Sequence, residues 1–275
     1  MLDTRTVFDR DGLQIADVVC RHERGKGAVE EAPMHGIGFV RQGCFVRNAG
    51  GAERTLDPST VFFVNPGEEQ RYDHPHRGGD DCTALSLGAD LVASIWGGDP
   101  TLPREPFHSP PRLDLEHRLL LAGARRGEDL DELGEWAILV VANALECCDG
   151  SRAQSGRPAS SRDRRALVEE AREALAADPD LSLPALARLL ATSPHHLSRL
   201  FRSFTGHTIS RHRMRLRARA VLERLAAGDR NLARLAAEIG FADQSHLCRV
   251  VRSETGSTPS SLREALAATT LDSPP

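Results

Sequence analysis

Hydrophobic and polar positions change their period about halfway along the chain. Between residues 36 and 87, short β-branched and aromatic runs alternate with turn signals such as Pro66-Gly67. This pattern predicts strands at 36–46, 60–65, 71–72 and 83–87. Strands this short and this frequent are typical of a small antiparallel β-barrel or sandwich. Residues 1–33 are polar and lack such a pattern, so we expect an irregular arm there.

From about residue 113 onward the apolar spacing becomes helical. The segment 128–148 is apolar on nearly all sides between Trp136 and Leu145, so the barrel or a second subunit must cover the predicted helix. Residues 149–161 (DGSRAQSGRPASS) have the composition of a linker. The pattern predicts an α+β protein with a first, strand-rich domain at 1–148, the linker at 149–161 and an all-helical domain at 162–270.

Several short helices are predicted after the linker. Two of them, at 164–177 and 183–190, precede a helix that Ser193 caps and Gly206 ends. A long connecting helix follows at 208–227, then helices at 231–239, after the cap Asp243, and from Pro259 onward. On the helix capped by Ser193, one apolar stripe at helical spacing is expected to be buried: Leu197, Leu200, Phe201 and Phe204.

The helical part contains an internal repeat at an offset of 50 residues. Aligning Ser193–Arg213 with Asp243–Arg263 gives ten identical residues in 21 positions. Chance rarely copies a spaced pattern of this kind, and two copies indicate a pair of modules. Each copy is predicted to form a short helix, a tight turn and a second helix with a basic outer face. Two such units could bind two successive major grooves of DNA.

The charge distribution supports this interpretation. The net charge of −4 combines an acidic first part with a basic region from residue 160 onward, which has 18 arginines against 13 acids. No acid occurs from Leu181 to Leu222, where eight arginines and four histidines lie. Such a segment indicates a phosphate-facing surface, although a solvated basic face is the alternative.

Composition excludes some other classes of protein. No run of about 18 apolar residues predicts a membrane span, and the start of the chain has no secretory signal pattern. The six cysteines have no Cys-x-x-Cys spacing and are expected to be reduced, so we expect a cytoplasmic protein. No nucleophile elbow or phosphate loop is found, and no enzyme activity or cofactor is expected.

The segments LARLLATSPHHLSRLFRSFTG (186–206) and IGFADQSHLCRVVRSETGSTP (239–259) resemble the AraC-type, or arabinose-regulator, transcription factors. The resemblance covers about residues 164–268. It implies two helix-turn-helix units, joined by a long helix, with their recognition helices in adjacent major grooves. Double-stranded DNA is the implied partner, the implied source is bacterial, and contact with RNA polymerase is left open.

The resemblance also assigns roles to side chains. Candidates for base contact are His195, Ser198 and Arg199 in the first unit and Gln244, Ser245, Cys248 and Arg249 in the second. Arginine suits guanine and glutamine suits adenine in the major groove. Arg202 and Arg252 lie one turn further along and are expected to contact phosphate. His196 and His246 are expected to have a packing role.

The N-terminal half resembles, more loosely, the cupin-like sensor domain of the same regulators, mainly through LDPSTVFFVNPGEEQRY (56–72). This resemblance implies a small-molecule effector inside the barrel and a homodimer formed through the helices after it. Aromatic residues in or near the barrel strands are our candidates for the effector pocket: Phe39, Phe45, Phe63, Tyr72 and Trp96.

Three alternatives stay open. His74-Pro-His76, followed by Asp80, Asp81 and Cys82, could belong to a metal-binding cupin enzyme fused to a DNA-binding tail, although no converging ligand set is evident and no metal is expected. Cys44 and Cys82 could form a thiol sensor. The chain could also be a DNA-binding scaffold that needs no effector, which predicts a barrel filled by its own side chains.

Overall fold

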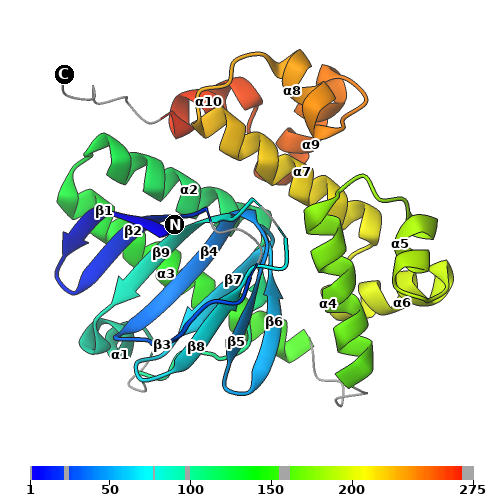
Figure 1. Ribbon diagram of the computed structural model, residues 1–275. Coiled ribbons are helices and arrows are strands. Elements are labelled where there is room, and N and C mark those ends of the chain that lie inside the picture. Colours follow the sequence, from blue (N-terminus) through cyan, green and yellow to red (C-terminus); the bar gives the residue numbers. More distant parts are fainter. Residues whose placement is uncertain (1, 22–24, 77, 97–99, 155–161, 268–275) are drawn as a thin grey trace.

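The computed structural model describes residues 2–21, 25–76, 78–96, 100–154 and 162–267. Its N-terminal part contains two antiparallel sheets that face each other (Figure 1). The large sheet has the strand order β1 (Leu2–Arg10), β2 (Leu13–Cys20), β9 (Asp80–Leu87), β4 (His35–Gly43), β7 (Thr60–Val64) and β10 (Phe107–His108). The small sheet has the order β3 (Val29–Glu31), β8 (Glu69–Asp73), β5 (Phe45–Ala49) and β6 (Ala52–Leu56).

Three helices pack on the large sheet, on the face away from the small sheet: α1 (Ala89–Trp96), α2 (Pro111–Arg126) and α3 (Leu130–Gln154). The main core lies between these helices and the sheet and includes Ile15, Leu85 and Leu121. The large sheet is therefore buried on both faces. Because α3 continues to Gln154, its last turns occupy the start of the predicted linker, and residues 155–161 lie outside the described residues.

The expectation of an irregular arm at 1–33 is wrong. β1 and β2 form a hairpin that extends the large sheet, with pairing from Leu2–Cys20 to Arg10–Leu13. Asp11 and Gly12 form its turn with φ of 52° and 75°, which is the backbone that an Asp-Gly hairpin turn requires. The polar pattern is misleading because β1 is an edge strand with Phe8 as its single fully buried residue.

The space between the two sheets is filled by side chains of the protein. Phe45, Phe62 and Tyr72 pack there edge to face or tilted, with ring centroids 5.6–6.3 Å apart. Gln70 Oε1 accepts hydrogen bonds from Tyr72 Oη at 2.7 Å and from Arg47 Nε at 3.2 Å. This packing is the feature that the effector-independent alternative predicts.

The five aromatic residues chosen as an effector pocket do not surround one space. Phe39, Phe63 and Trp96 belong to the core under the helices, whereas Phe45 and Tyr72 lie between the two sheets. The choice fails because both faces of the large sheet are buried, so alternation along a strand does not reveal which face is the interior.

The C-terminal part is all helical: α4 (Arg162–Ala177), α5 (Leu183–Leu189), α6 (Pro194–Thr205), α7 (Ile209–Ala226), α8 (Leu232–Ile239), α9 (Gln244–Thr255) and α10 (Pro259–Leu266). It has one core around Leu186 and Phe201 and a second around Leu235 and Leu247, with α7 shared between them. The predicted fold class is confirmed, with antiparallel sheets followed by two helix-turn-helix units. Among the described residues, no helix is both long and apolar enough to cross a membrane.

Candidate nucleic-acid interface

The first helix-turn-helix unit consists of α5 and α6. Ser193 caps α6 by accepting a hydrogen bond from the His196 amide at 3.2 Å, and Pro194 occupies the first helical position. The helix ends at Gly206, whose φ of 76° is the left-handed conformation that glycine adopts without strain. Leu197 and Phe201 anchor α6 in the first core, so its position relative to α5 is determined by packing.

The second unit, α8 and α9, follows the same plan. Asp243 caps α9 by accepting from the His246 amide at 2.6 Å, and the helix ends at Gly256 with φ of 77°. The turn before it contains Gly240 at φ of 86°. Leu247 and Val251 are buried in the second core.

The sequence repeat is reproduced atom by atom at the end of each recognition helix. Thr205 Oγ1 donates to Phe201 O at 2.7 Å, and its counterpart Thr255 Oγ1 donates to Val251 O at 2.8 Å. Thr205 Oγ1 also accepts a hydrogen bond from the His207 amide, and Thr255 Oγ1 accepts one from the Ser257 amide. Thr208 and Thr258 then cap the helices that follow, α7 and α10. The two units are therefore structural copies joined by α7.

The candidate base-contacting side chains lie on the outer faces of α6 and α9. Most are exposed, and Ser198 and Cys248 are half-buried: His195, Ser198 and Arg199 on α6, and Gln244, Ser245, Cys248 and Arg249 on α9. Arg202 and Arg252, the expected phosphate contacts, are exposed one turn further along. Within the described part of the chain, Arg199, Arg202, Arg249 and Arg252 form no ion pair with an acid. Their charges are available to a nucleic acid.

The arginines of α7 behave differently. Arg211 and Arg215 pair with Glu254 of α9, at 2.5 Å and 3.5 Å, and Arg217 pairs with Asp180. Arg219 is buried and points toward the N-terminal domain. The acid-free segment of the sequence is therefore not one continuous phosphate-facing surface, because acids from outside the segment neutralise much of its α7 portion.

Of two side chains expected to pack inside the helical units, Phe204 does not and His246 does. Phe204 is 38% exposed, so its place in the buried stripe of α6 is wrong. It lies at the end of the helix and faces the cleft toward the barrel rather than the core of its own unit. His246 stacks edge to face on Phe241 at 5.5 Å, which agrees with a packing role.

Buried ion pairs connect the helical domain to the barrel domain. Glu223 of α7 lies 3.2 Å from both Arg41 of β4 and Arg118 of α2. Arg219 Nε lies 3.1 Å from Asp114 of α2. Arg126 at the end of α2 donates to the carbonyl oxygens of Ala265 and Ala267, next to α10. α7 and α10 are thus held directly against the N-terminal domain.

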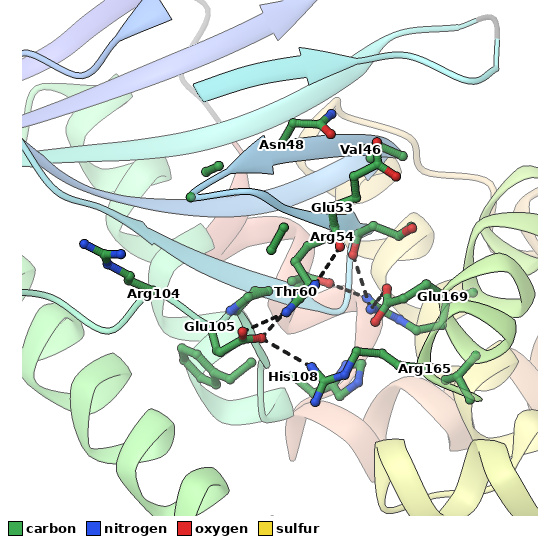
Figure 2. A pocket seen from close by; sticks show the side chains of 18 of the residues that line it. Val46, Asn48, Glu53, Arg54, Thr60, Arg104, Glu105, His108, Arg165 and Glu169 are labelled. Atoms are coloured by element: carbon green, nitrogen blue, oxygen red, sulfur yellow. Dashed lines mark hydrogen bonds and ion pairs between the residues drawn. The ribbon is translucent and has the colours of Figure 1, made fainter. Parts of the chain in front are cut away.

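A cleft of about 2550 Å³ separates the small sheet from α4 and α6. Figure 2 shows how side chains of both domains meet in it. Glu105 accepts from Arg54 of β6, at 2.7 Å and 3.0 Å, and from Arg165 of α4 at 3.3 Å. None of the five aromatic residues proposed as a pocket lines this cleft. The sequence could not reveal it, because residues more than a hundred positions apart form its walls.

A set of histidines lies at the inner end of the cleft. His207 Nε2 is 3.2 Å from His212 Nδ1, and their rings stack at 5.4 Å. Burial, together with nearby Arg172, lowers the pKa of His212 to about 3. Burial and Arg215 lower the pKa of His207 to about 4. Both rings are therefore neutral near pH 7.

The metal alternative is met only in part, because His74 lies beside Asp80 but His76 does not join them. His76 Nε2 lies 3.1 Å from Glu173 of α4, away from His74, whose Nε2 lies 2.6 Å from Asp80 Oδ1. The His-x-His pair therefore does not share a site. Burial raises the pKa of both Cys44 and Cys82, so neither thiol has the thiolate character of a redox sensor.

The family model of a helix-turn-helix domain matches residues 186–265, and no curated protein sequence matches the chain. Among solved structures, ToxT from Vibrio cholerae is 12% identical with a TM-score of 0.39, covering 94% of this chain and 100% of that one. Unsaturated fatty acid-bound ToxT is 13% identical with a TM-score of 0.36, covering 94% and 97%. A cupin superfamily protein from Desulfitobacterium hafniense is 17% identical with a TM-score of 0.28, covering 32% and 77%.

Proposed function

We propose that this chain is a sequence-specific, DNA-binding regulator of transcription, because residues 186–265 match a helix-turn-helix domain. The observation that carries the proposal is the pair of equivalent recognition helices. Each presents an exposed arginine at the base-contacting position, Arg199 or Arg249, with a second arginine one turn further along. Arginine can donate two hydrogen bonds to guanine O6 and N7, whereas the second arginine can neutralise a phosphate.

The spacing of the units supports contact with successive major grooves. α7 has 18 residues and is therefore about 27 Å long. One turn of B-DNA is about 34 Å, so a connecting helix of this length is compatible with two recognition helices on one face of the duplex. Caps at Ser193 and Asp243 leave other amides at both helix N-termini free to bind phosphate oxygens.

The barrel domain, in this proposal, controls DNA binding through a small effector in the interdomain cleft. Two observations support this. The cleft is lined by both the barrel and α4, and the second unit is connected to α2 through Glu223 and Arg219. A ligand that binds one arrangement of the domains better than another shifts the population toward it, and this changes the relative positions of the recognition helices.

We also propose that the protein is a homodimer. It would act in the cytoplasm, bound to DNA. α3 presents two exposed apolar side chains, Ile138 at 38% and Leu139 at 61% exposed, on the side opposite to its buried Val140 and Val141. A second copy of the chain packed on this face would cover them and would place two double recognition units on one operator.

Selection of bound sequences from random duplex DNA tests the proposal with the full-length protein. We expect an enriched motif with two patches about 10 base pairs apart, doubled if the protein is a dimer. The variant Arg199→Ala/Arg249→Ala should lose the motif. Arg112→Ala, which removes an exposed charge from α2 in the other domain, is the matched control and should retain it. If the wild-type protein enriches no motif, base recognition is contradicted. It is also contradicted if Arg112→Ala loses the motif while the double variant retains it.

A further inference from the structure

Three buried side chains with metal-binding chemistry converge at one end of the barrel. They are Cys20 at the end of β2, His74 just after β8 and Asp80 at the start of β9. Their ligand atoms all lie within 4.8 Å of one another. Cys20 Sγ is 3.5 Å from His74 Nε2, which in turn is 2.6 Å from Asp80 Oδ1.

The fold brings these residues together from both sheets. Cys20 and Asp80 are directly opposite each other in the pairing of β2 with β9, so they share a face of the large sheet. His74 belongs to the other side of the barrel, where its backbone exchanges two hydrogen bonds with Gly25, at 2.8 Å and 3.0 Å. The cluster therefore lies where the two sheets meet.

A glycine permits this close approach. Gly79 immediately precedes Asp80 and has a φ of 68°, which is a left-handed conformation. A Cβ atom at this position would collide with the carbonyl oxygen of Cys20. Any side chain larger than hydrogen would therefore push Asp80 away from Cys20 and His74.

A second thiol lies beside Asp80 but outside the group of three converging ligand atoms. Cys82 follows Asp80 by two residues, points to the same face, and its Sγ lies 3.4 Å from Asp80 Oδ2. With Zn–S and Zn–N bonds of about 2.3 and 2.0 Å, tetrahedral geometry separates a sulfur and a nitrogen ligand by ~3.6 Å. Cys20 Sγ and His74 Nε2 already have nearly this separation, whereas His74 and Asp80 would need to move apart by less than about 1 Å.

We propose that Cys20, His74 and Asp80 form a binding site for a thiophilic divalent metal ion of the zinc type. A sulfur, an imidazole nitrogen and a carboxylate oxygen suit Zn²⁺, whereas Mg²⁺ and Ca²⁺ require mostly oxygen ligands. Binding releases the Cys20 thiol proton to solvent, and His74 coordinates through a ring-nitrogen lone pair. All three side chains are buried, which separates a bound ion from bulk solvent.

The site contains His74 and Asp80 of the metal alternative considered from the sequence, but not the second histidine of that motif. His76 takes no part, because it faces Glu173 of α4. Cys20 enters instead, from a strand 54 residues before His74. An ion bound here would link the large sheet to the segment after β8 and would stabilise the barrel independently of DNA binding.

Metal content and cobalt spectroscopy of the full-length protein test the site. The protein is depleted with a chelator under reducing conditions, reloaded with Zn²⁺ and measured by elemental analysis. About one Zn²⁺ per chain is expected, with a higher melting temperature than the depleted protein. Co²⁺ should produce a thiolate-to-cobalt charge-transfer band in the near ultraviolet and the visible bands of tetrahedral coordination. Absence of the charge-transfer band, or no retained Zn²⁺, would overturn the proposal.

Variants locate the ion. Cys20→Ser and the near-isosteric Asp80→Asn should each weaken Zn²⁺ binding by at least about 100-fold. Replacing a residue that only hydrogen-bonds a metal ligand already lowers affinity by about 10- to 100-fold, and replacing the ligand itself should lower it further. Cys44→Ser is the matched control, since Cys44 is also a buried barrel thiol but lies outside the cluster. Equal Zn²⁺ content in Cys20→Ser, Asp80→Asn and Cys44→Ser would overturn the assignment. A wild-type far-ultraviolet circular dichroism spectrum, with its β-sheet contribution, confirms that Asp80→Asn is folded.

Discussion

Arg172 of α4 forms a buried ion pair with Asp57 of the barrel domain, with Nη2 2.9 Å from Oδ2. Arg172 also donates to Thr60 Oγ1 at 2.6 Å, and Asp57 accepts from the Ser59 amide at 2.7 Å. Burial opposes ionisation of Asp57, but Arg172, His212 and Ser59 overcome this effect and hold the pKa of the carboxyl well below its usual range. The pair is therefore charged and hydrogen-bonded where the two domains meet.

Removing one partner of this pair should be costly. Arg172→Ala leaves the Asp57 charge buried without its counterion, and such changes cost about 3–5 kcal/mol of unfolding free energy. Arg165→Ala is the control on the same helix, because its pair with Glu105 is about half exposed and should contribute at most about 1 kcal/mol. Urea titration of both variants measures the difference in unfolding free energy. Equal losses of unfolding free energy would show that the buried Asp57 pair stabilises the protein no more than the exposed pair does.

The same region should make stability depend on pH. His212 faces Asp57, Arg172, His207 and Arg219, and burial followed by the nearby arginine lowers its pKa to about 3. An unfolded histidine has a pKa of about 6.5, so the unfolded state binds the proton more readily and stability falls as pH drops from about 6.5 toward 3. Each such histidine contributes a slope of up to about 1.4 kcal/mol per pH unit within this range.

His212→Gln should reduce that slope in chemical unfolding measured between pH 7 and pH 5. His195→Gln, which changes an exposed histidine of α6, should leave the slope as it is in the wild-type protein. His117, on the buried face of α2, also has its pKa lowered to about 3 by burial, so part of the slope should persist in His212→Gln. An unchanged slope in His212→Gln would mean that its ring is not buried and neutral in the folded protein.

Local signals in the sequence were sufficient for the helical domain. Caps such as Ser193 and Asp243, stops such as Gly206, and helical apolar spacing act within a few residues, and the helices begin and end close to the predicted positions. The internal repeat correctly predicted that the two helix-turn-helix units are structural copies of each other. The prediction of a buried Phe204 was wrong because this side chain lines the cleft between the domains, which the helical spacing of α6 does not reveal.

The barrel and its candidate sites were less predictable, because their geometry depends on long-range pairing. The Asp11-Gly12 turn was a usable signal for the first hairpin, but the polar edge strand β1 concealed it. Cys20 and Asp80 become neighbours only through the register of β2 with β9. Nothing in the local pattern of either strand indicates that register.

A charge on α3 should disrupt the proposed dimer. Leu139→Glu places a carboxylate on a side chain that is 61% exposed in a single chain but would be buried between two copies. We expect the variant to be monomeric in light scattering after gel filtration, at concentrations where the wild-type protein is a dimer. Glu135→Gln, an exposed change one turn earlier, is the control and should stay dimeric. Dimers in both variants would place the interface elsewhere.

Arg199 and Arg202 should differ in what they contribute to DNA binding. Arg199 is proposed to contact a base, so Arg199→Ala should cost about 1–3 kcal/mol on the selected sequence and relax preference at one base pair. Arg202 is expected to contact phosphate, so Arg202→Ala should weaken binding to all sequences and reduce the slope of log K against log salt by about 1. Affinities for selected and random duplexes over a range of salt concentrations measure both effects. Equal losses on the two duplexes for Arg199→Ala would remove its role in base recognition, because only a contact to a base edge distinguishes one sequence from another.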